Sequence, residues 1–180
     1  MKRLTLLRHA KSDWDDPVAR DFDRPLNRRG EKAAMLMGRH AAEQGMRFDL
    51  LVASPAVRVT QTLDTFFAGF GATLETRWDR RIYLASSATL LDVVRDLPDS
   101  ADTVLMAGHN PGLEELILDL VPDNGANALR DDVEAKFPTA SIAVLDLAID
   151  HWADVAANVG TLASFTRPRD LDAALGPQAH

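Results

Sequence analysis

The 180-residue sequence contains no cysteine. Disulfide bonds, thiolate nucleophiles and cysteine-ligated zinc or iron–sulfur sites are therefore excluded. No stretch approaches the ~20 apolar residues that a membrane-spanning helix needs. The apolar run near the N-terminus, Leu4 to Leu7, is too short for the core of a secretory signal. We therefore expect a cytoplasmic protein that makes no use of a membrane.

Basic residues are also fewer than acidic ones, and the net charge is −7. An acidic chain lacks the basic face that binding to a nucleic-acid backbone requires, so we expect no nucleic-acid partner. A hydrophobic content of 46% and a charged content of 26% are typical of a folded chain with a sizeable core. We expect one domain over residues 1–180, which can bind an anionic ligand only through a local cationic pocket.

Short, continuously apolar runs alternate with helical patterns, and this predicts an α/β fold with strands buried on both faces of a parallel sheet. The expected strands are residues 5–8, 49–54, 102–107, 141–147 and 161–166, and the expected helices are residues 27–45, 55–68, 87–97 and 112–121. Asn27 and Ser54 are predicted to cap two of these helices. The tail after Arg167 is expected to be loosely held.

Arg8 and His9 directly follow the first predicted strand, in the segment LLRHAKS. One interpretation is that the strand simply reaches the surface there. The other is that His9 is a nucleophile or base and Arg8 binds a phosphate group, since a neutral imidazole keeps a lone pair that can attack phosphorus.

Arg58 lies in the first turn of the helix predicted to follow Ser54, in the segment SPAVRVTQT. A helix N-terminus is already electropositive, so an arginine is poorly placed there unless an anion is bound. A solvated surface arginine remains the alternative.

His109 follows the third predicted strand, in the turn-rich segment Gly108-His109-Asn110-Pro111-Gly112. A single histidine in such a loop can be incidental. Three such features at three strand ends are harder to explain in that way, because the carboxyl edge of an open α/β sheet is where ligands bind.

The ordered set of these motifs resembles the histidine phosphatase superfamily, which has the phosphoglycerate mutase-like fold. The resemblance rests on Leu7-Arg8-His9-Ala10, Ser54-Pro55-x-x-Arg58-x-x-Gln61-Thr62 and Gly108-His109-Asn110-Pro111. The segments RHAKSDW, DFDRPLNRRG and GHNPGLEEL are similar to the SixA-type phosphohistidine phosphatases, and the likeness extends from Leu4 to about Leu171.

The resemblance implies a three-layer α/β/α fold with a mostly parallel central sheet and a metal-independent phosphatase with no cofactor. It implies that His9 becomes phosphorylated, that Arg8 and Arg58 bind the phosphoryl oxygens, and that His109 stabilises charge in the transition state. Lys11, Ser12 and Asn110 are further candidates for substrate binding.

Larger superfamily members carry an inserted cap region and a carboxylate that protonates the leaving group. Only about forty residues separate Arg58 from the third predicted strand, which leaves no room for a large cap. The intervening RWDRRIYLASS offers Asp79 and Tyr83, and pairing of Asp79 with neighbouring arginines is a simpler account than proton donation. Phosphohistidine has a better leaving group than an alkyl ester, so a site without an acid suits a phosphohistidine protein as substrate.

Two other functions stay open: hydrolysis of small phosphorylated molecules on the same scaffold, and phosphate binding without catalysis. Arg20 and Arg24 can either recognise an acidic substrate or belong to a solvated loop, and residues 13–24 can either close over substrate or not. Trp14 is expected to be a packing anchor.

Overall fold

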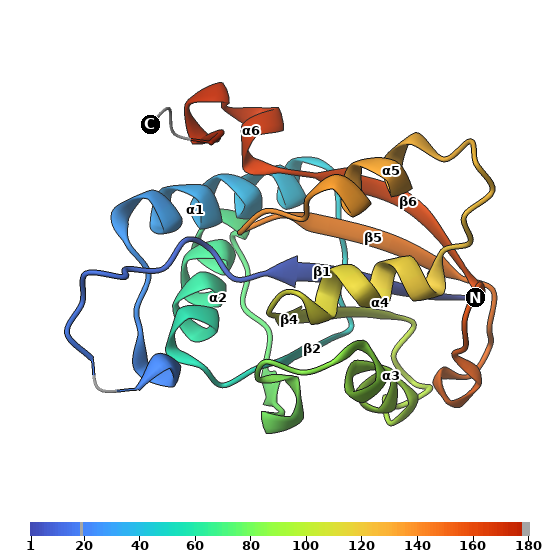
Figure 1. Cartoon of the computed structure of the whole chain (residues 1–180). Helices are drawn as coiled ribbons and strands as arrows, with labels where there is room; N and C mark the ends of the chain where they lie inside the picture. The colour runs from blue at the N-terminus through green and yellow to red at the C-terminus, as the bar shows by residue number, and fades with distance from the viewer. Residues whose placement is uncertain (19, 178–180) are drawn as a thin grey trace.

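The structure, a computed structural model, describes residues 1–18 and 20–177. Within these residues the chain forms a six-stranded sheet with helices on both faces (Figure 1). The strands are β1 (Lys2–Arg8), β2 (Leu50–Ala53), β3 (Thr76–Trp78), β4 (Thr103–Gly108), β5 (Ile142–Leu147) and β6 (Gly160–Thr166). Their order across the sheet is β3-β2-β4-β1-β5-β6.

The sheet is mostly parallel, as predicted. β1 pairs in parallel with β4, β4 with β2, and β2 with β3, whereas β5 is antiparallel to both β1 and β6. The expectation that residues 141–147 form a parallel strand is therefore wrong. β5 is buried along most of its length, as β1 is, so its apolar residues carry no signal of strand direction. β3 was not predicted, because it is a short edge strand that is largely exposed and so lacks an apolar run.

The helices form the two outer layers of an α/β/α arrangement. They are α1 (Arg28–Glu43), α2 (Val57–Phe70), α3 (Ser87–Arg95), α4 (Gly112–Leu120), α5 (Ala128–Ala135) and the short α6 (Pro168–Leu171). Helices α1 and α2 pack on one face of the sheet, and α3, α4 and α5 on the other. Only a short 3₁₀ helix, η2 (Arg80–Ile82), lies between β3 and α3, so no large cap is inserted.

Alternation along β1 divides the core between the two faces. Leu4 and Leu6 belong to the cluster packed against α3 and α4, whereas Leu7 belongs to the cluster with α1 and α2. All three side chains are fully buried. Both sheet faces therefore need apolar side chains, and only the strand ends are available for polar groups.

Helix α1 is capped as predicted and is held close to the end of β1. The side chain of Asn27 accepts a hydrogen bond of 2.8 Å from the backbone N–H of Gly30. A Cβ atom on Gly30 would lie 2.1 Å from the carbonyl oxygen of Lys11. A residue without a side chain is therefore needed where α1 packs on the loop that follows His9.

Two local expectations are wrong. Ser54 does not cap α2, which begins at Val57 after the non-helical Ala56; the Ser54 hydroxyl instead bonds to His109. The tail after Arg167 is not loose as far as residue 177. It forms α6 and the 3₁₀ helix η4 (Ala173–Leu175), and the Arg29 guanidinium donates to the Gly176 carbonyl.

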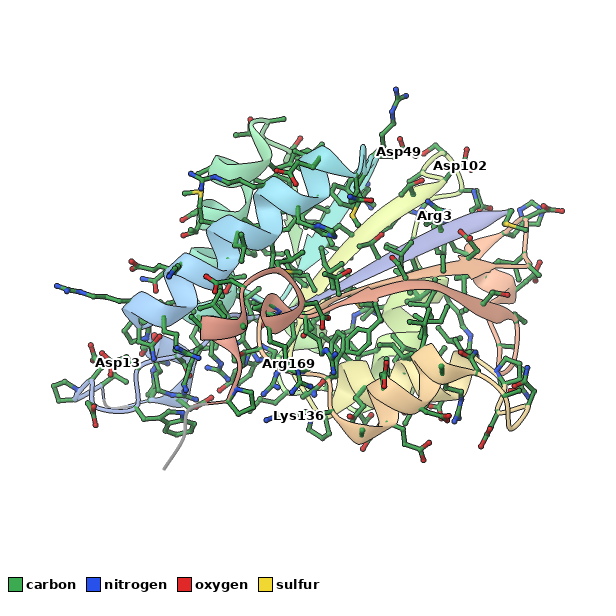
Figure 2. The ribbon with its side chains drawn as sticks, turned by 90° about the horizontal axis from the view of Figure 1, so that it is seen from above. Arg3, Asp13, Asp49, Asp102, Lys136 and Arg169 are labelled. Carbon is green, nitrogen blue, oxygen red and sulfur yellow. The ribbon has the colours of Figure 1, made fainter. Side chains whose placement is uncertain are left out.

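The strand ends place charged groups at two opposite edges of the sheet (Figure 2). Arg3, Asp49 and Asp102 lie at one end, and Lys136 and Arg169 lie at the other, beside the loop that holds Asp13. Among the described residues, no helix combines the length and apolar character that crossing a bilayer requires.

Candidate active site

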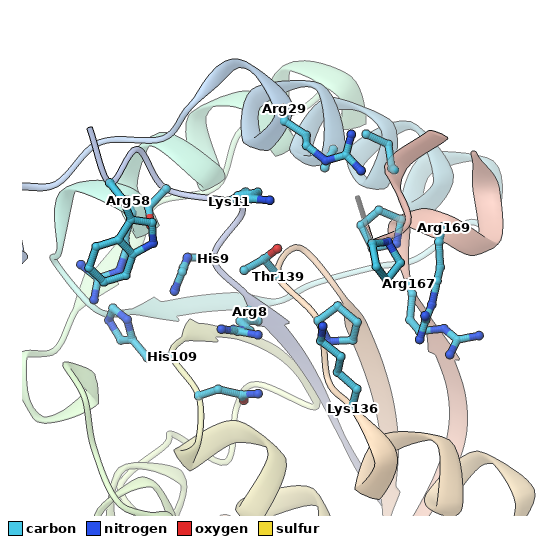
Figure 3. Close-up of a pocket in the computed structure, with 18 of the residues that line it drawn as sticks. Arg8, His9, Lys11, Arg29, Arg58, His109, Lys136, Thr139, Arg167 and Arg169 are labelled. Carbon is cyan, nitrogen blue, oxygen red and sulfur yellow. The ribbon is translucent and has the colours of Figure 1, made fainter. Parts of the chain in front are cut away.

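The three motif-bearing strands are neighbours in the sheet. β2, β4 and β1 are adjacent and parallel, so their carboxyl ends meet at one edge. Backbone hydrogen bonds hold the three ends together: the N–H of His9 donates to the Gly108 carbonyl, and that of Ser54 to the Ala107 carbonyl, both at 3.1 Å. The pocket at this edge contains Arg8, His9, Arg58 and His109 (Figure 3). The sheet order thus converts three separate motifs into one site.

His9 is held as a neutral imidazole with a defined tautomer. Its side chain is buried, and burial is the main reason that its pKa falls to about 3. Its Nδ1 lies 2.7 Å from the carbonyl oxygen of Ala10. A carbonyl only accepts hydrogen bonds, so Nδ1 carries the proton and the lone pair remains on Nε2.

His109 lies beside His9, with 5.4 Å between the ring centroids. Burial lowers its pKa to about 3, and the positive charge of Arg58 adds to this effect. Its Nε2 lies 2.8 Å from the Ser54 hydroxyl, which fixes the plane of the ring. Tyr83 packs edge-on against the other side. His109 is therefore also neutral and firmly oriented.

Arg8 and Arg58 supply fixed positive charge to the pocket. Arg58 is buried on α2, and Arg8 donates from Nη1 to the Phe137 carbonyl at 2.9 Å. The Nε atoms of both arginines and Nδ1 of His109 are buried without a hydrogen-bond partner among the described residues. Unpaired cationic and N–H groups in one pocket favour the binding of an anion.

Asp21 is a pocket residue that the sequence analysis missed. Its backbone and carboxylate oxygens accept hydrogen bonds of 2.9 and 3.0 Å from Arg58. The carboxylate also accepts from Arg24 at 2.6 Å and from the Tyr83 hydroxyl at 2.7 Å. Partial burial alone would raise the pKa of Asp21, but these donors hold it well below its ordinary value. Asp21 is therefore ionised and cannot donate a proton near neutrality.

Arg24 is likewise part of the pocket rather than of a solvated loop. It is buried and donates to Ser12 and Asp21. Its guanidinium carbon lies 3.4 Å from the centroid of the Trp14 ring. Trp14 lines the pocket and is 77% exposed, so it is not a packing anchor. Arg20 is exposed and pairs with Asp23. The sequence signal for Arg24 was its place as the single cation of the DFDRPL segment.

The weaker candidates have mixed positions. Lys11, Ser12 and Asn110 all line the pocket. Lys11 is exposed, whereas the Ser12 hydroxyl is occupied by Arg24. Asn110 donates to the Phe137 carbonyl at 3.0 Å and accepts from the backbone N–H of Glu114 at 3.2 Å. Lys11 is therefore the most available of the three for a ligand.

Asp79 lies outside the residues that line the pocket. Its carboxylate binds the side chain of Arg81 at 2.8 Å and caps η2 by accepting from the Arg81 backbone N–H. The hydrogen bonds from Arg81 lower the pKa of Asp79. Asp79 therefore has the structural role that the sequence favoured, and it is not positioned to protonate a leaving group.

Gln61 and Thr62, the last two residues of the motif that begins at Ser54, make hydrogen bonds to nearby loops. The Thr62 hydroxyl accepts from the Ala10 backbone N–H at 2.9 Å, and the Gln61 side chain accepts from the Leu26 backbone N–H at 2.8 Å. Both residues tie α2 to the loops that border His9. Their role is to position the site.

Comparison with known proteins agrees with this geometry. The family model described as the histidine phosphatase superfamily, branch 1, matches residues 4–81. A candidate phosphohistidine phosphatase SixA from Agrobacterium tumefaciens is 31% identical, with a TM-score of 0.77 over 93% of this chain and 98% of that one. This chain is a SixA-type member of the histidine phosphatase superfamily.

Two further proteins are similar to this chain over nearly its full length. A candidate SixA from Nakamurella multipartitia has a TM-score of 0.81 at 28% identity, over 93% of this chain and 96% of that one. An uncharacterised protein of Mycobacterium tuberculosis is 36% identical over 91% of this chain and 100% of its own length. The histidine phosphatase keeps the phosphoglycerate mutase-like fold without a large cap and is a phosphatase.

Proposed function

We propose that this histidine phosphatase removes phosphoryl groups from phosphohistidine proteins, through a covalent phosphohistidine on its own His9 and without a metal ion. The proposal names four groups that act on the phosphoryl group. His9 is the nucleophile, Arg8 and Arg58 bind the phosphoryl oxygens, and His109 stabilises the charge that develops on them.

One observation carries the proposal: the hydrogen bond from His9 Nδ1 to the Ala10 carbonyl. It leaves the lone pair on Nε2, in a ring whose pKa is lowered to about 3, so the nucleophile is ready at neutral pH without prior deprotonation. A buried histidine held only for packing would need no cationic neighbours.

The reaction has two displacement steps. In the first, Nε2 of His9 forms a bond to phosphorus while the bond to the substrate nitrogen breaks, and its electron pair leaves with the substrate imidazole, whose other ring nitrogen has taken a proton from solvent. In the second, water attacks phosphorus, the bond to Nε2 breaks, and the electron pair returns to His9 as phosphate departs with the protons of the water. Arg8 and Arg58 hold the phosphoryl oxygens in both steps, so catalysis consists mainly of positioning and charge stabilisation.

Among the described residues that line the pocket, no carboxyl group is able to donate a proton, and this favours phosphohistidine over phosphate esters. Asp21 is ionised and Asp79 is bound to Arg81 outside the pocket. An alkoxide leaving group needs a proton from such an acid, whereas an imidazole that solvent has protonated on its other ring nitrogen departs as a neutral base. That the protein is cytoplasmic stays a prediction.

The test follows the phosphoryl group. The protein is incubated with a ³²P-labelled phosphohistidine protein, quenched in alkali, and assayed for label on the enzyme and for released phosphate. We expect label on the wild type and none on His9→Ala, with phosphate release lost in the variant. Activity that persists in His9→Ala would refute the nucleophile, and loss of activity with a chelator would refute a metal-independent mechanism.

Side-by-side turnover of phosphohistidine protein and small phosphate esters tests the substrate. Activity confined to the esters would favour the small-molecule phosphatase. Phosphate binding with no turnover of either would identify a non-catalytic binding module.

A further inference from the structure

The pocket extends beyond the groups that the phosphoryl reaction uses. Its volume is about 580 Å³, within the range of sites that enclose a whole organic ligand. Past Lys11 and Thr139 it is lined by four cationic side chains, which we call the basic arm: Arg29, Lys136, Arg167 and Arg169 (Figure 3).

The basic arm is assembled from distant parts of the chain. Arg29 lies in the first turn of α1, and Lys136 is the C-cap residue of α5. Arg167 and Arg169 flank the start of α6, in the tail that packs back on α1. Its cations are therefore brought together by the fold, and they are not a local run of basic residues on a solvated loop.

The charges of the basic arm are poorly compensated within the protein. Arg167 pairs with Asp170 at 2.8 Å, and Arg29 donates to the neutral Gly176 carbonyl. Among residues 1–18 and 20–177, neither Lys136 nor Arg169 has an acidic group within 4.0 Å. The Nε of Arg169 is also buried without a hydrogen-bond partner in this part of the chain.

The charge of the pocket exceeds what one phosphoryl group balances. Eight Arg and Lys residues line it: Arg8, Lys11, Arg24, Arg29, Arg58, Lys136, Arg167 and Arg169. Asp21 is the single carboxylate among the described lining residues. A phosphoryl group held by Arg8 and Arg58 leaves Arg29, Lys136 and Arg169 of the basic arm without an acidic partner within 4.0 Å among residues 1–18 and 20–177, in a protein whose net charge is −7. Cations gathered in a partly enclosed cavity repel one another, and an anionic ligand relieves that repulsion.

We propose that the basic arm binds a second anionic group of the substrate, a carboxylate or phosphate on the same molecule as the phosphoryl group that His9 attacks. The inference rests on the proposed function and extends it from the reaction to the substrate. Arg169 has the planar fork that suits a carboxylate or phosphate, and Lys136 adds a mobile point charge. Substrates with one anionic group are bound more weakly than substrates with two.

Binding of non-hydrolysable phosphonates tests the arm without relying on turnover. Isothermal titration calorimetry compares alkylphosphonates with carboxyalkylphosphonates of increasing chain length on the wild type. A carboxylate at the right distance should improve affinity about tenfold to a hundredfold, the value of one charge-assisted hydrogen bond. Equal affinities at every chain length would overturn the proposal.

Two variants test whether the gain in affinity from the carboxylate comes from the basic arm. In Lys136→Ala and Arg169→Gln, the ratio of the two affinities should fall toward one. Lys136 is exposed, so its variant does not depend on tolerance of a buried change. Arg47→Ala is the matched control, because it removes the same charge from a second cavity at the other end of the sheet. An equal loss of the ratio in the control would mean that only net charge matters, which also overturns the proposal.

Peptides identify the source of the second anion. Phosphohistidine peptides with Glu or Gln at neighbouring positions are compared by kcat/KM in the wild type and in Lys136→Ala. A preference for Glu that the variant loses assigns the arm to acidic side chains of a protein substrate; discrimination confined to the phosphonates assigns it to a small molecule. Selective binding of carboxyalkylphosphonates without any turnover would support the basic arm and refute the proposed function. Turnover of phosphohistidine without such selectivity would support the proposed function and refute the basic arm.

Discussion

Burial of His9 as a neutral imidazole should make the stability of the protein depend on pH in a specific way. Its pKa is about 3 in the folded protein and 6.5 as its ordinary value. The unfolded chain therefore binds a proton between these values that the folded protein does not. The stabilisation is complete above pH 6.5 and is lost as the pH falls toward 3. At pH 5, about 1.5 units below the ordinary value, the loss is about 2 kcal/mol.

The variant His9→Asn isolates this contribution. Other groups also titrate between pH 7 and pH 5, but their effects cancel when the variant and the wild type are compared. Between these two pH values, the free energy of unfolding of His9→Asn should fall by about 2 kcal/mol less than that of the wild type. His109 is present in both proteins and shifts both curves in the same direction.

Urea denaturation at pH 5 and pH 7 provides the measurement, at constant ionic strength and without phosphate, since a bound anion would stabilise the folded state. Thr139→Ala is the control, because it alters the same pocket without removing a titrating group. Its stability should follow the pH dependence of the wild type. Equal decreases for His9→Asn and the wild type would show that folding does not lower the pKa of His9, and the account of an imidazole held neutral by burial would fail.

Three further variants test the packing of α1, the orientation of His109 and the role of Asp79. Gly30→Ala should lower the free energy of unfolding by roughly 1–3 kcal/mol, because the new Cβ would lie 2.1 Å from the Lys11 carbonyl oxygen; an increase in the melting temperature, as for an ordinary helical Gly→Ala change, would contradict this. Ser54→Ala should reduce kcat about tenfold with little change in KM, because His109 loses the hydroxyl that holds its ring; an unchanged kcat would show that the ring needs no such support. Asp79→Asn should leave kcat for phosphohistidine and for an aryl phosphate within about threefold of the wild type, whereas loss of a true general acid costs on the order of a hundredfold or more.

The sequence was most informative where chemistry is local to a strand end. Arg8, His9 and His109 each follow an apolar strand directly, and Arg58 lies in the first turn of a helix. Such placements are costly for charged groups unless they bind something, so the pattern indicated an anion-binding site, and the resemblance to the histidine phosphatases implied phosphoryl transfer there. The cap of α1 at Asn27 was predictable for a similar reason, because capping depends on residues within one helical turn.

Residues whose role depends on contacts across the chain were missed or misread. Asp21 and Arg24 belong to a segment that appeared to be a solvated loop, yet their bonds to Arg58 and Ser12 bring that segment into the pocket. Ser54 looked like a helix cap because a serine precedes Pro55, but its hydroxyl serves His109, 55 residues away. No local pattern encodes such partners.

The α/β class thus follows from the sequence by itself, because strand periodicity and turn residues are local properties. The family resemblance, which rests on local motifs and their spacing, implied the four residues expected to act on phosphate and the absence of a large cap. Tertiary structure decided that β2, β4 and β1 lie side by side, that β5 runs antiparallel, and that the tail from Arg167 to residue 177 borders the pocket. These features depend on how distant segments share one core and one sheet edge. The same long-range packing buried His9 and gathered the basic arm beside it, whereas the hydrogen bond from His9 Nδ1 to the adjacent Ala10 carbonyl is local.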